Sequence, residues 1–333
     1  KDRPFFVHLE HFAVHDPIQG RRELVEKYRK KLAGMPEAKG PGYILEPNPD
    51  GPPLSEEELK GLEKNDVLNA HQEKRVWWVK QRQDNVEFAG MLEATDESLG
   101  RIRAKLEELG LAENTIVIFT ADNGGMSASN QYRGINHSGK RLDSRFASSN
   151  LPLRGAKGWN YEGGIRVPLI VHWPGEVGAN TMSHAMVTGT DFYPTLLEMI
   201  GLPMLPKQHV DGMSFLPALK GRDHDRGAIY WHFPHYSNHG YQSPGGAIRL
   251  GNYKLLEYYE NGSVELFDLK EDLGEQNDLS KAKPEITGKL LKMLKDWRRE
   301  MDAKMPQPKG ATSSINQRKS PTAPVLTRVD RTK

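Results

Sequence analysis

The chain has no cysteine among its 333 residues. Disulfides, thiolate metal sites and a cysteine nucleophile are therefore excluded within it, and the redox compartment stays undetermined. It also has no run of about 18 apolar residues, the length that spans a membrane. An excess of one charge is missing too, because 46 basic side chains stand against 44 acidic ones. With no overall field to attract nucleic acid or an anionic membrane, a charged ligand has to be held by a local site.

Three apolar, β-branched runs predict strands. They are RPFFVHLEHFAVH (3–15), TIVIFTAD (115–122) and IRVPLIVHWPG (165–175), and each is followed by turn residues. His8 and His11 lie inside the first of these runs, where we expect core or supporting groups.

Two helical patterns alternate with these runs. Apolar positions recur at helical spacing from about Val79 to Leu109, with a bend expected near Asp84 and an end at Gly110. TDFYPTLLEMIGLP (190–203) predicts a second helix, capped at Thr190 or Asp191. Strand and helix in alternation predict an α/β fold with a mostly parallel sheet sandwiched by helices.

The segment after Asp16-Pro17 is rich in proline, glycine and charge for about fifty residues. It predicts a long excursion with one capped helix at SEEELKGLEK (55–64), where Ser55 precedes three glutamates.

The sequence pattern changes after residue 225. Strand-like runs follow, and Asn261-Gly262 is a strong signal for a hairpin turn. A last helix over 284–305 is expected to pack on a small antiparallel sheet. We therefore divide the chain into an α/β domain (1–225), an antiparallel subdomain (226–305) and a basic flexible tail (306–333). The tail alone could support a nucleic-acid role, and such tails are more often solvated ends, so we expect no nucleic-acid partner.

The stretch FTADNGG (119–125) sets a carboxylate, a carboxamide and two glycines at a strand end. Ligands collect at the carboxyl ends of parallel strands. Asp122 and Asn123 supply hard oxygens, which suit Ca²⁺ or Mg²⁺ better than Zn²⁺. Gly124 and Gly125 allow a sharp turn and an open approach to a ligand. The same four residues also have ideal turn composition, so a plain turn is an equal alternative on these residues alone.

Two further residues are placed at strand ends. Lys157, between small residues in LRGAKGWNYEGG (153–164), can set an ammonium against an anion. His15 ends an apolar run just before Asp-Pro, so its ring is expected to project from the sheet. Each residue alone has an ordinary structural explanation, but together they indicate an anion site.

Five segments in order, FAVHDP, FTADNGG, LPLRGAKGWNYEGGIRVPLIVHWPG, TDFYPTLLEMIGLP and DGMSFLPALKG, resemble the central and C-terminal parts of the sulfatase family, within the alkaline-phosphatase-like superfamily. The resemblance covers nearly the whole chain to about residue 280. It implies that Asp122 and Asn123 are ligands of one Ca²⁺ and that His15 and Lys157 contact the sulfate group. It also implies a sulfuric ester hydrolase of the arylsulfatase type, with the C-terminal hairpin subdomain.

The family's nucleophile is a formylglycine made in a CxPSR-type motif, and neither this motif nor the family's N-terminal aspartate pair is found in the chain. NLPLR (150–154) matches the spacing of that motif, but Asn150 would occupy the nucleophile's place and an amide cannot become the aldehyde. We expect the chain to be the larger, C-terminal part of a sulfatase whose first segment is missing, and expect this part alone to be inactive.

Two alternatives remain open. A phosphoric ester hydrolase of the same superfamily is the first, although such relatives commonly have histidine where Asn123 stands. A non-catalytic binder of sulfated glycans is the second.

The substrate is the least defined part. WHFPHYSNHGYQSP (231–244) combines histidines and aromatic rings that suit a sugar ring or an aryl group, so His232, His235 and Arg249 are candidate substrate-binding residues. Packing between the subdomains is an equal alternative for the histidines. We expect a sulfated carbohydrate or an aryl sulfate ester, in a periplasmic or secreted protein by family analogy, with the oligomeric state undetermined. Asn261-Gly-Ser is a glycosylation sequon, but the hairpin turn is its better use.

Overall fold

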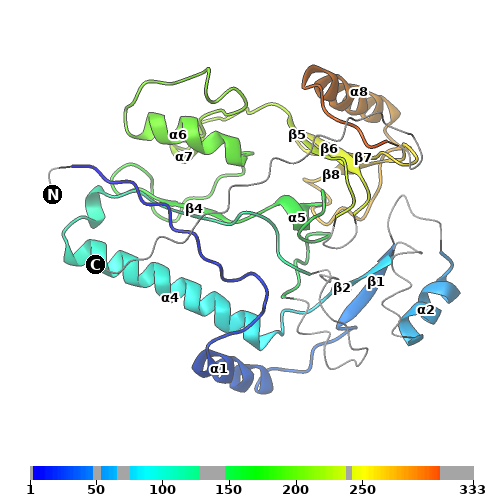
Figure 1. The fold of residues 1–333 in the computed structure, drawn as a ribbon, viewed down its shortest axis with the longest axis horizontal. Coiled ribbons are helices and arrows are strands. Elements are labelled where there is room, and N and C mark those ends of the chain that lie inside the picture. Colours follow the sequence, from blue (N-terminus) through cyan, green and yellow to red (C-terminus); the bar gives the residue numbers. More distant parts are fainter. Residues whose placement is uncertain (1–2, 48–53, 66–75, 128–146, 238–241, 308–333) are drawn as a thin grey trace, which may run out of the picture.

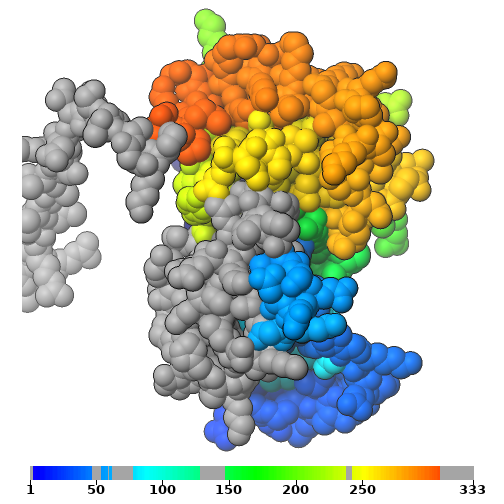
Figure 2. All heavy atoms as spheres, turned by 90° about the vertical axis from the view of Figure 1, so that its right-hand side faces the viewer, coloured from blue at the N-terminus to red at the C-terminus, as the bar shows by residue number. Residues whose placement is uncertain are grey.

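The computed structural model describes residues 3–47, 54–65, 76–127, 147–237 and 242–307. A four-stranded sheet and its helix lie at one end of the molecule, and a pair of packed helices lies at the other (Figure 1). Figure 2 shows the same arrangement from the side, with the C-terminal helix (orange) at the top and the first helix (blue) at the bottom. The helices are α1 (Arg22–Ala33), α2 (Glu56–Asn65), α4 (Val86–Glu108), α5 (Glu162–Ile165), α6 (Phe192–Met199), α7 (Leu216–Leu219) and α8 (Pro284–Glu300). The strands are β1 (Tyr43–Pro47), β2 (Val76–Lys80), β3 (Val117–Thr120), β4 (Leu169–His172), β5 (Ile229–Phe233), β6 (Gly245–Leu250), β7 (Tyr253–Tyr258) and β8 (Val264–Asp268).

The C-terminal sheet has the antiparallel order β5-β6-β7-β8, as predicted. Its last hairpin turns at Asn261-Gly262, where Gly262 has φ +71° and the Asn261 side chain accepts from Ser263 N at 2.9 Å. The predicted last helix is α8, which packs against β6 and β7. The Trp297 ring of α8 stacks on Tyr230 of β5 with centroids 4.8 Å apart and planes 6° apart.

Side chains alternate between the two faces of this sheet, and both faces are buried. On one face, Leu255 and Leu266 pack in a cluster with Leu290 and Leu294 of α8. Their neighbours Leu256 and Phe267 face the other way, onto a cluster that includes Trp159 of the segment 153–164. The sheet therefore carries a helix on one face and the lysine-bearing segment on the other.

The other end of the molecule holds α1 against α4, with exposed ion pairs between them such as Lys27–Glu93 at 2.5 Å. The predicted long helix begins later than expected, because residues 76–80 form β2 and Asn85 caps α4 by accepting from the amides of Glu87 and Phe88. Its predicted end is right, since Gly110 follows with φ +63°. The proline-rich excursion contains α1 and β1, which the sequence reading missed.

Two predicted helix starts can be checked. Ser55 and Glu58 form the expected capping box of α2, with Glu58 N donating to Ser55 Oγ at 3.2 Å and Ser55 N to Glu58 Oε2 at 3.0 Å. Asp191 is the N-cap position of α6, as predicted, but its side chain makes no cap bond to α6. Thr188 forms the capping box, with Asp191 as its partner, on a short 3-10 turn that leads into α6.

The prediction of a parallel sheet is not supported by the strand pair that should form it. β3 and β4 pair antiparallel, with Val117 opposite His172 and Thr120 opposite Leu169. Among the described residues, every strand pair is antiparallel.

The predicted strand over residues 3–15 is also not formed within the described residues. The segment runs extended across the molecule (Figure 1), and its apolar side chains are largely exposed, with Phe6 at 80% and Phe12 at 73%. His8 and His11 are exposed rather than buried. A strand forms only where a partner supplies its ladder of hydrogen bonds, and none of the described strands pairs with this segment.

The division at residue 225 stays a prediction, and residues 308–333 of the expected tail lie outside the described part of the chain. The described residues contain no helix long and apolar enough to cross a membrane.

Candidate active site

The residues after β3 form a tight turn. Asp122 is exposed and its Oδ1 accepts from Asn123 N at 3.0 Å. The Asn123 amino group donates to Gly124 O at 2.9 Å, which leaves its Oδ1 as an oxygen donor for a ligand. The segment therefore forms a turn and also carries two hard oxygens, so the turn interpretation and the metal-ligand interpretation are compatible.

Gly124 is required by packing. It donates from its amide to Gly164 O at 3.0 Å, and a side chain on it would place Cβ 1.9 Å from Gly163 O. The backbone of the Asp122 turn thus lies directly on the backbone at α5. This close contact, rather than the open approach expected from sequence, is the observed reason for glycine.

Lys157 lies on a loop that is hydrogen-bonded to this turn. Its amide donates to Gly125 O at 3.0 Å, so the lysine is three residues and one hydrogen bond from the Asp122–Asn123 pair. Its side chain is half-buried. A cation in this position can attract an anionic ligand.

His15 approaches from a third segment. Ala13 and Val14 just before it pack on a small core that contains Met126, the residue after Gly125. The His15 ring is exposed, and its Nδ1 lies 2.7 Å from Asp16 Oδ1. With Nδ1 held by a carboxylate, Nε2 is the nitrogen left to exchange a proton with a ligand.

A buried ion network fixes the segment that carries Lys157 to the C-terminal sheet. Lys254 of β7, fully buried, lies 3.0 Å from Glu162 Oε1 and 2.8 Å from Glu275 Oε1. Glu162 N donates to Glu275 Oε2 at 2.7 Å. Arg249 of β6 reaches Glu162 Oε2 at 3.6 Å.

The pKa values of the two carboxylates in this network are shifted in opposite directions. Burial raises the pKa of Glu162, but the charges of Lys254 and Arg249 outweigh burial and the pKa lies below its ordinary value. Burial raises the pKa of Glu275, and Lys254 offsets only part of this increase. Glu162 is therefore the firmly ionised partner of Lys254.

A second buried group supports the same segment. Arg154 lies over the Tyr161 ring at 4.2 Å and pairs with Glu46 of β1 at 2.5 Å. Tyr161 and Tyr258 both hydrogen-bond to Glu265 of β8. The loop between Arg154 and Glu162 is thus held at one end by a half-buried charged group, Arg154, and at the other by a buried one, Glu162.

The donor set at the Asp122 turn fits a hard cation in kind. A carboxylate and an amide oxygen are ligands that Ca²⁺ prefers, but Ca²⁺ takes about six to eight oxygens. Among the described residues, no group of three or more His, Asp or Glu side chains could hold a metal ion. Asp122 and Asn123 can therefore supply part of a Ca²⁺ shell.

The three substrate-binding candidates lie on or beside the C-terminal sheet. His232 on β5 has both ring nitrogens engaged, Nδ1 with Tyr259 OH at 2.7 Å and Nε2 with Lys304 O at 2.9 Å. His235 is exposed, with its ring 4.1 Å from that of Phe233. Arg249 faces Glu162, and burial lowers its pKa despite that carboxylate. The contacts of His232 match the packing alternative. Of the two histidines, His235 is the one whose exposed ring can meet a ligand. Arg249 belongs to the buried ion network.

Sequence reasoning missed Asn150 and the Lys254 network. Asn150 was considered only as a false nucleophile, although its side chain bonds three backbone carbonyls of the site. Glu162, Lys254 and Glu275 are far apart in the chain, and no spacing rule links them. The glycines before Ile165 were the one available signal that this segment packs backbone to backbone.

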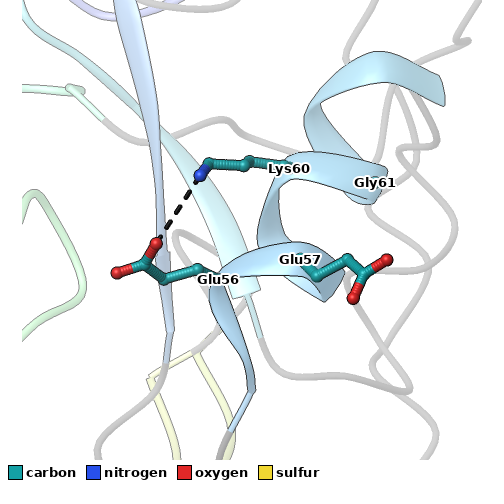
Figure 3. A pocket seen from close by; sticks show the side chains of 4 residues that line it. All are labelled: Glu56, Glu57, Lys60 and Gly61. Atoms are coloured by element: carbon teal, nitrogen blue, oxygen red, sulfur yellow. Dashed lines mark ion pairs between the residues drawn. The ribbon is translucent and has the colours of Figure 1, made fainter.

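A surface hollow on α2 lies outside this site. It is lined by Glu56, Glu57, Lys60 and Gly61, and Figure 3 shows Glu57 pointing away from the Glu56–Lys60 pair. The pair spans 3.5 Å on consecutive turns of the helix. Such a pair is the ordinary surface pattern of a helix.

Two known families match the chain. The family described as "Sulfatase" matches residues 1–202, and the family described as "N-sulphoglucosamine sulphohydrolase, C-terminal" matches residues 156–301. The first match spans the segments of His15, Asp122, Asn123 and Lys157, and the second spans the C-terminal sheet and α8.

Individual relatives point the same way. A "Sulfatase" of Formosa agariphila is 30% identical over 320 residues, 89% of this chain and 46% of the relative. Human "Arylsulfatase A" is 31% identical over 243 residues, 65% of this chain and 44% of the relative. The chain spans about half the length of the curated relatives it matches.

Solved structures share the fold. The crystal structure of Ps i-CgsB in complex with k-i-k-neocarrahexaose matches with a TM-score of 0.60 at 24% identity, over 89% of this chain and 50% of that one. The structure of BT4656 with D-glucosamine-2-N,6-O-disulfate matches with a TM-score of 0.52 at 22% identity, over 76% of this chain and 47% of that one. These likenesses support the α/β architecture with a C-terminal antiparallel sheet. Because the sulfatase family model covers 202 of the 333 residues, the chain belongs to the sulfatase family.

Proposed function

We propose that the protein is a sulfuric ester hydrolase that acts on sulfated carbohydrates, and that this chain supplies the binding half of its active site. The observation that carries the proposal is the hydrogen bond from Lys157 N to Gly125 O, which holds the backbone of the half-buried Lys157 against the turn that carries Asp122 and Asn123. A lysine and hard oxygen ligands on adjoining loops suit a metal-bound anion such as a sulfate ester. A sugar is favoured as the esterified group because N-acetylgalactosamine-6-sulfatases are among the relatives and sulfated-saccharide complexes among the structural neighbours.

In this proposal Asp122 and Asn123 hold part of the shell of a Ca²⁺ ion, with Mg²⁺ as the other hard cation of the same class. The bound cation would neutralise charge on the sulfate oxygens. Lys157 binds a sulfate oxygen through its ammonium. His15 donates a proton from Nε2 to the leaving alcohol oxygen, while Asp16 holds Nδ1 and so fixes the ring.

The family's formylglycine derives from cysteine or serine in a CxPSR-type motif, and neither form of this motif is found in the 333 residues. No step is therefore assigned to that group here. The residues of this chain are proposed to bind, orient and protonate. His235 is proposed to contact the sugar or aryl part of the substrate. Arg249 and His232 are proposed to form the adjoining part of the substrate-binding surface. A periplasmic or secreted location is proposed by analogy with the family.

The test starts from the natively produced protein. Its intact mass and the coding sequence upstream of Lys1 establish which residues accompany this chain, and sulfate release is then measured with nitrophenyl sulfate and with sulfated sugars. Asp122→Ala and Lys157→Ala are expected to abolish release, and Ca²⁺ binding followed by calorimetry is expected to weaken in Asp122→Ala only. Full sulfate release by both variants would refute the proposal. Phosphate release without sulfate release would favour the phosphoric ester alternative, and binding of sulfated sugar without release would favour the glycan-binding alternative.

A further inference from the structure

One side chain joins the three backbone segments of the candidate site. The amino group of Asn150 lies 2.9 Å from Gly125 O, 3.1 Å from Gly155 O and 3.0 Å from Gly163 O. Gly125 belongs to the Asp122 turn, Gly155 stands two residues before Lys157, and Gly163 lies in α5. No other described side chain bonds all three segments.

The acceptors are all carbonyl oxygens, so only a donor group can serve them. An amide NH₂ has two hydrogens, and three acceptors at these distances share them. The other side of the carboxamide is also closely fitted, because a side chain on Gly125 would place its Cβ 2.5 Å from Asn150 Oδ1. The carboxamide therefore fills a site shaped for its size and polarity.

The Gly125 carbonyl connects this arrangement to the chemistry. It accepts from Asn150 Nδ2 at 2.9 Å and also from Lys157 N at 3.0 Å. Because Gly125 follows Asp122 and Asn123 by two or three residues, the carbonyl sets where the lysine stands relative to the two oxygen ligands. A substitution at Asn150 is therefore expected to move Lys157 relative to Asp122 and Asn123 without altering any of these three residues.

We propose that Asn150 is the positioning residue that sets Lys157 against the Asp122–Asn123 pair. This inference rests on the proposed function for the roles of those three residues, but the geometry can be tested without any catalytic assay. Replacement by aspartate keeps the shape and puts an acceptor opposite three acceptors, so the segments are expected to separate.

The first readout is hydrogen exchange of backbone amides in this chain. In Asn150→Asp, the amides of Lys157 and Gly124 are expected to exchange about tenfold faster, the effect of losing one hydrogen bond. The amide of Leu279, which donates to Leu266 O at 2.7 Å in the C-terminal part, is expected to be unchanged. Asn114→Asp, at an exposed site after α4, is the matched control and should alter none of these amides.

The outcomes are distinct. Equal acceleration at Leu279 would show that Asn150 supports the whole fold, and unchanged exchange at Lys157 and Gly124 would show that it holds neither segment; either result overturns the proposal. If the aspartate variant does not fold, Asn150→Ala carries the same expectation.

The second readout is kinetic, in the natively produced protein. A misplaced lysine is expected to lower kcat/KM for sulfate release about 100-fold, mostly in kcat, with Asn114→Asp unaffected. An unchanged kcat would contradict the positioning role. If the unaltered protein releases no sulfate, the proposed function fails, and the exchange result alone decides whether Asn150 holds the two segments.

Discussion

Residues 3–15 and strand β7 both combine aromatic and aliphatic side chains, but their surroundings differ. Phe6 in the first is 80% exposed, whereas Leu255 and Leu256 in the second are 0% and 1% exposed. β7 has a partner strand on each side and packed material on both faces. The N-terminal run pairs with none of the described strands. The comparison shows that apolar composition becomes a strand only through pairing and packing.

The largest effect is expected where the well-packed region buries charge. Lys254→Met removes the cation between Glu162 and Glu275 and leaves two carboxylates together inside the protein. Breaking a buried pair from one side costs about 3–5 kcal/mol. Urea unfolding should report this loss. Lys292→Met, which removes an exposed pair on α8, is the control and should leave the midpoint unchanged; a similar loss in both variants would contradict the account.

A direct comparison of the two regions uses one truncation in each. Leu294→Ala empties a fully buried position between α8 and the sheet, and we expect a loss of about 3 kcal/mol. Phe6→Ala removes a larger side chain from an exposed position, and we expect a change below about 0.5 kcal/mol. Thermal or urea unfolding of both variants checks the pair, and comparable losses would mean that residues 3–15 are packed in solution.

The pH dependence of the buried network should follow Glu162. Its folded pKa is lowered from 4.5, so its stabilising contribution is complete above that value and is lost as the pH falls through the folded pKa. Glu162→Gln should therefore cost about 2 kcal/mol near pH 7 and less near pH 4. Unfolding free energies of both proteins across this range test the sign. A difference that grows on acidification would rule it out.

The smallest effect is expected at α2, whose first turn is capped locally by Ser55 and Glu58. Ser55→Ala removes the bond that Glu58 N makes to Ser55 Oγ and should weaken the start of the helix by about 1 kcal/mol. Amide exchange in α2 is the measurement, since the effect is local. Ser55→Thr, which keeps the hydroxyl, should retain most of the protection.

The sequence predicted elements whose signals are local. Asn261-Gly262 specifies a hairpin by its own turn chemistry, Gly110 ends α4, and Ser55 with Glu58 starts α2. The helix α1 was missed because its few buried residues, Leu24 and Val25, are surrounded by charge. The strand over 3–15 was predicted from composition alone, which carries no information on a partner.

The candidate site was predictable only in part. The strand-end logic selected Asp122, Asn123 and Lys157, and the structure places them on adjoining loops. The strands β3 and β4 pair antiparallel rather than parallel. The turn after β3 nevertheless lies against the loop that carries Lys157. Asn150 and Lys254 escaped prediction, because what they bond is determined by long-range packing.

The stacking of Trp297 on Tyr230 gives the protein an internal optical reporter. The two rings belong to different elements, α8 and β5, and meet only when the helix is seated on the sheet. Detachment of α8 would expose the indole to water and shift its fluorescence to longer wavelength. In a variant that keeps Trp297 as its single tryptophan, the emission spectrum would therefore show whether the C-terminal sheet loses its helix before or together with the rest of the fold.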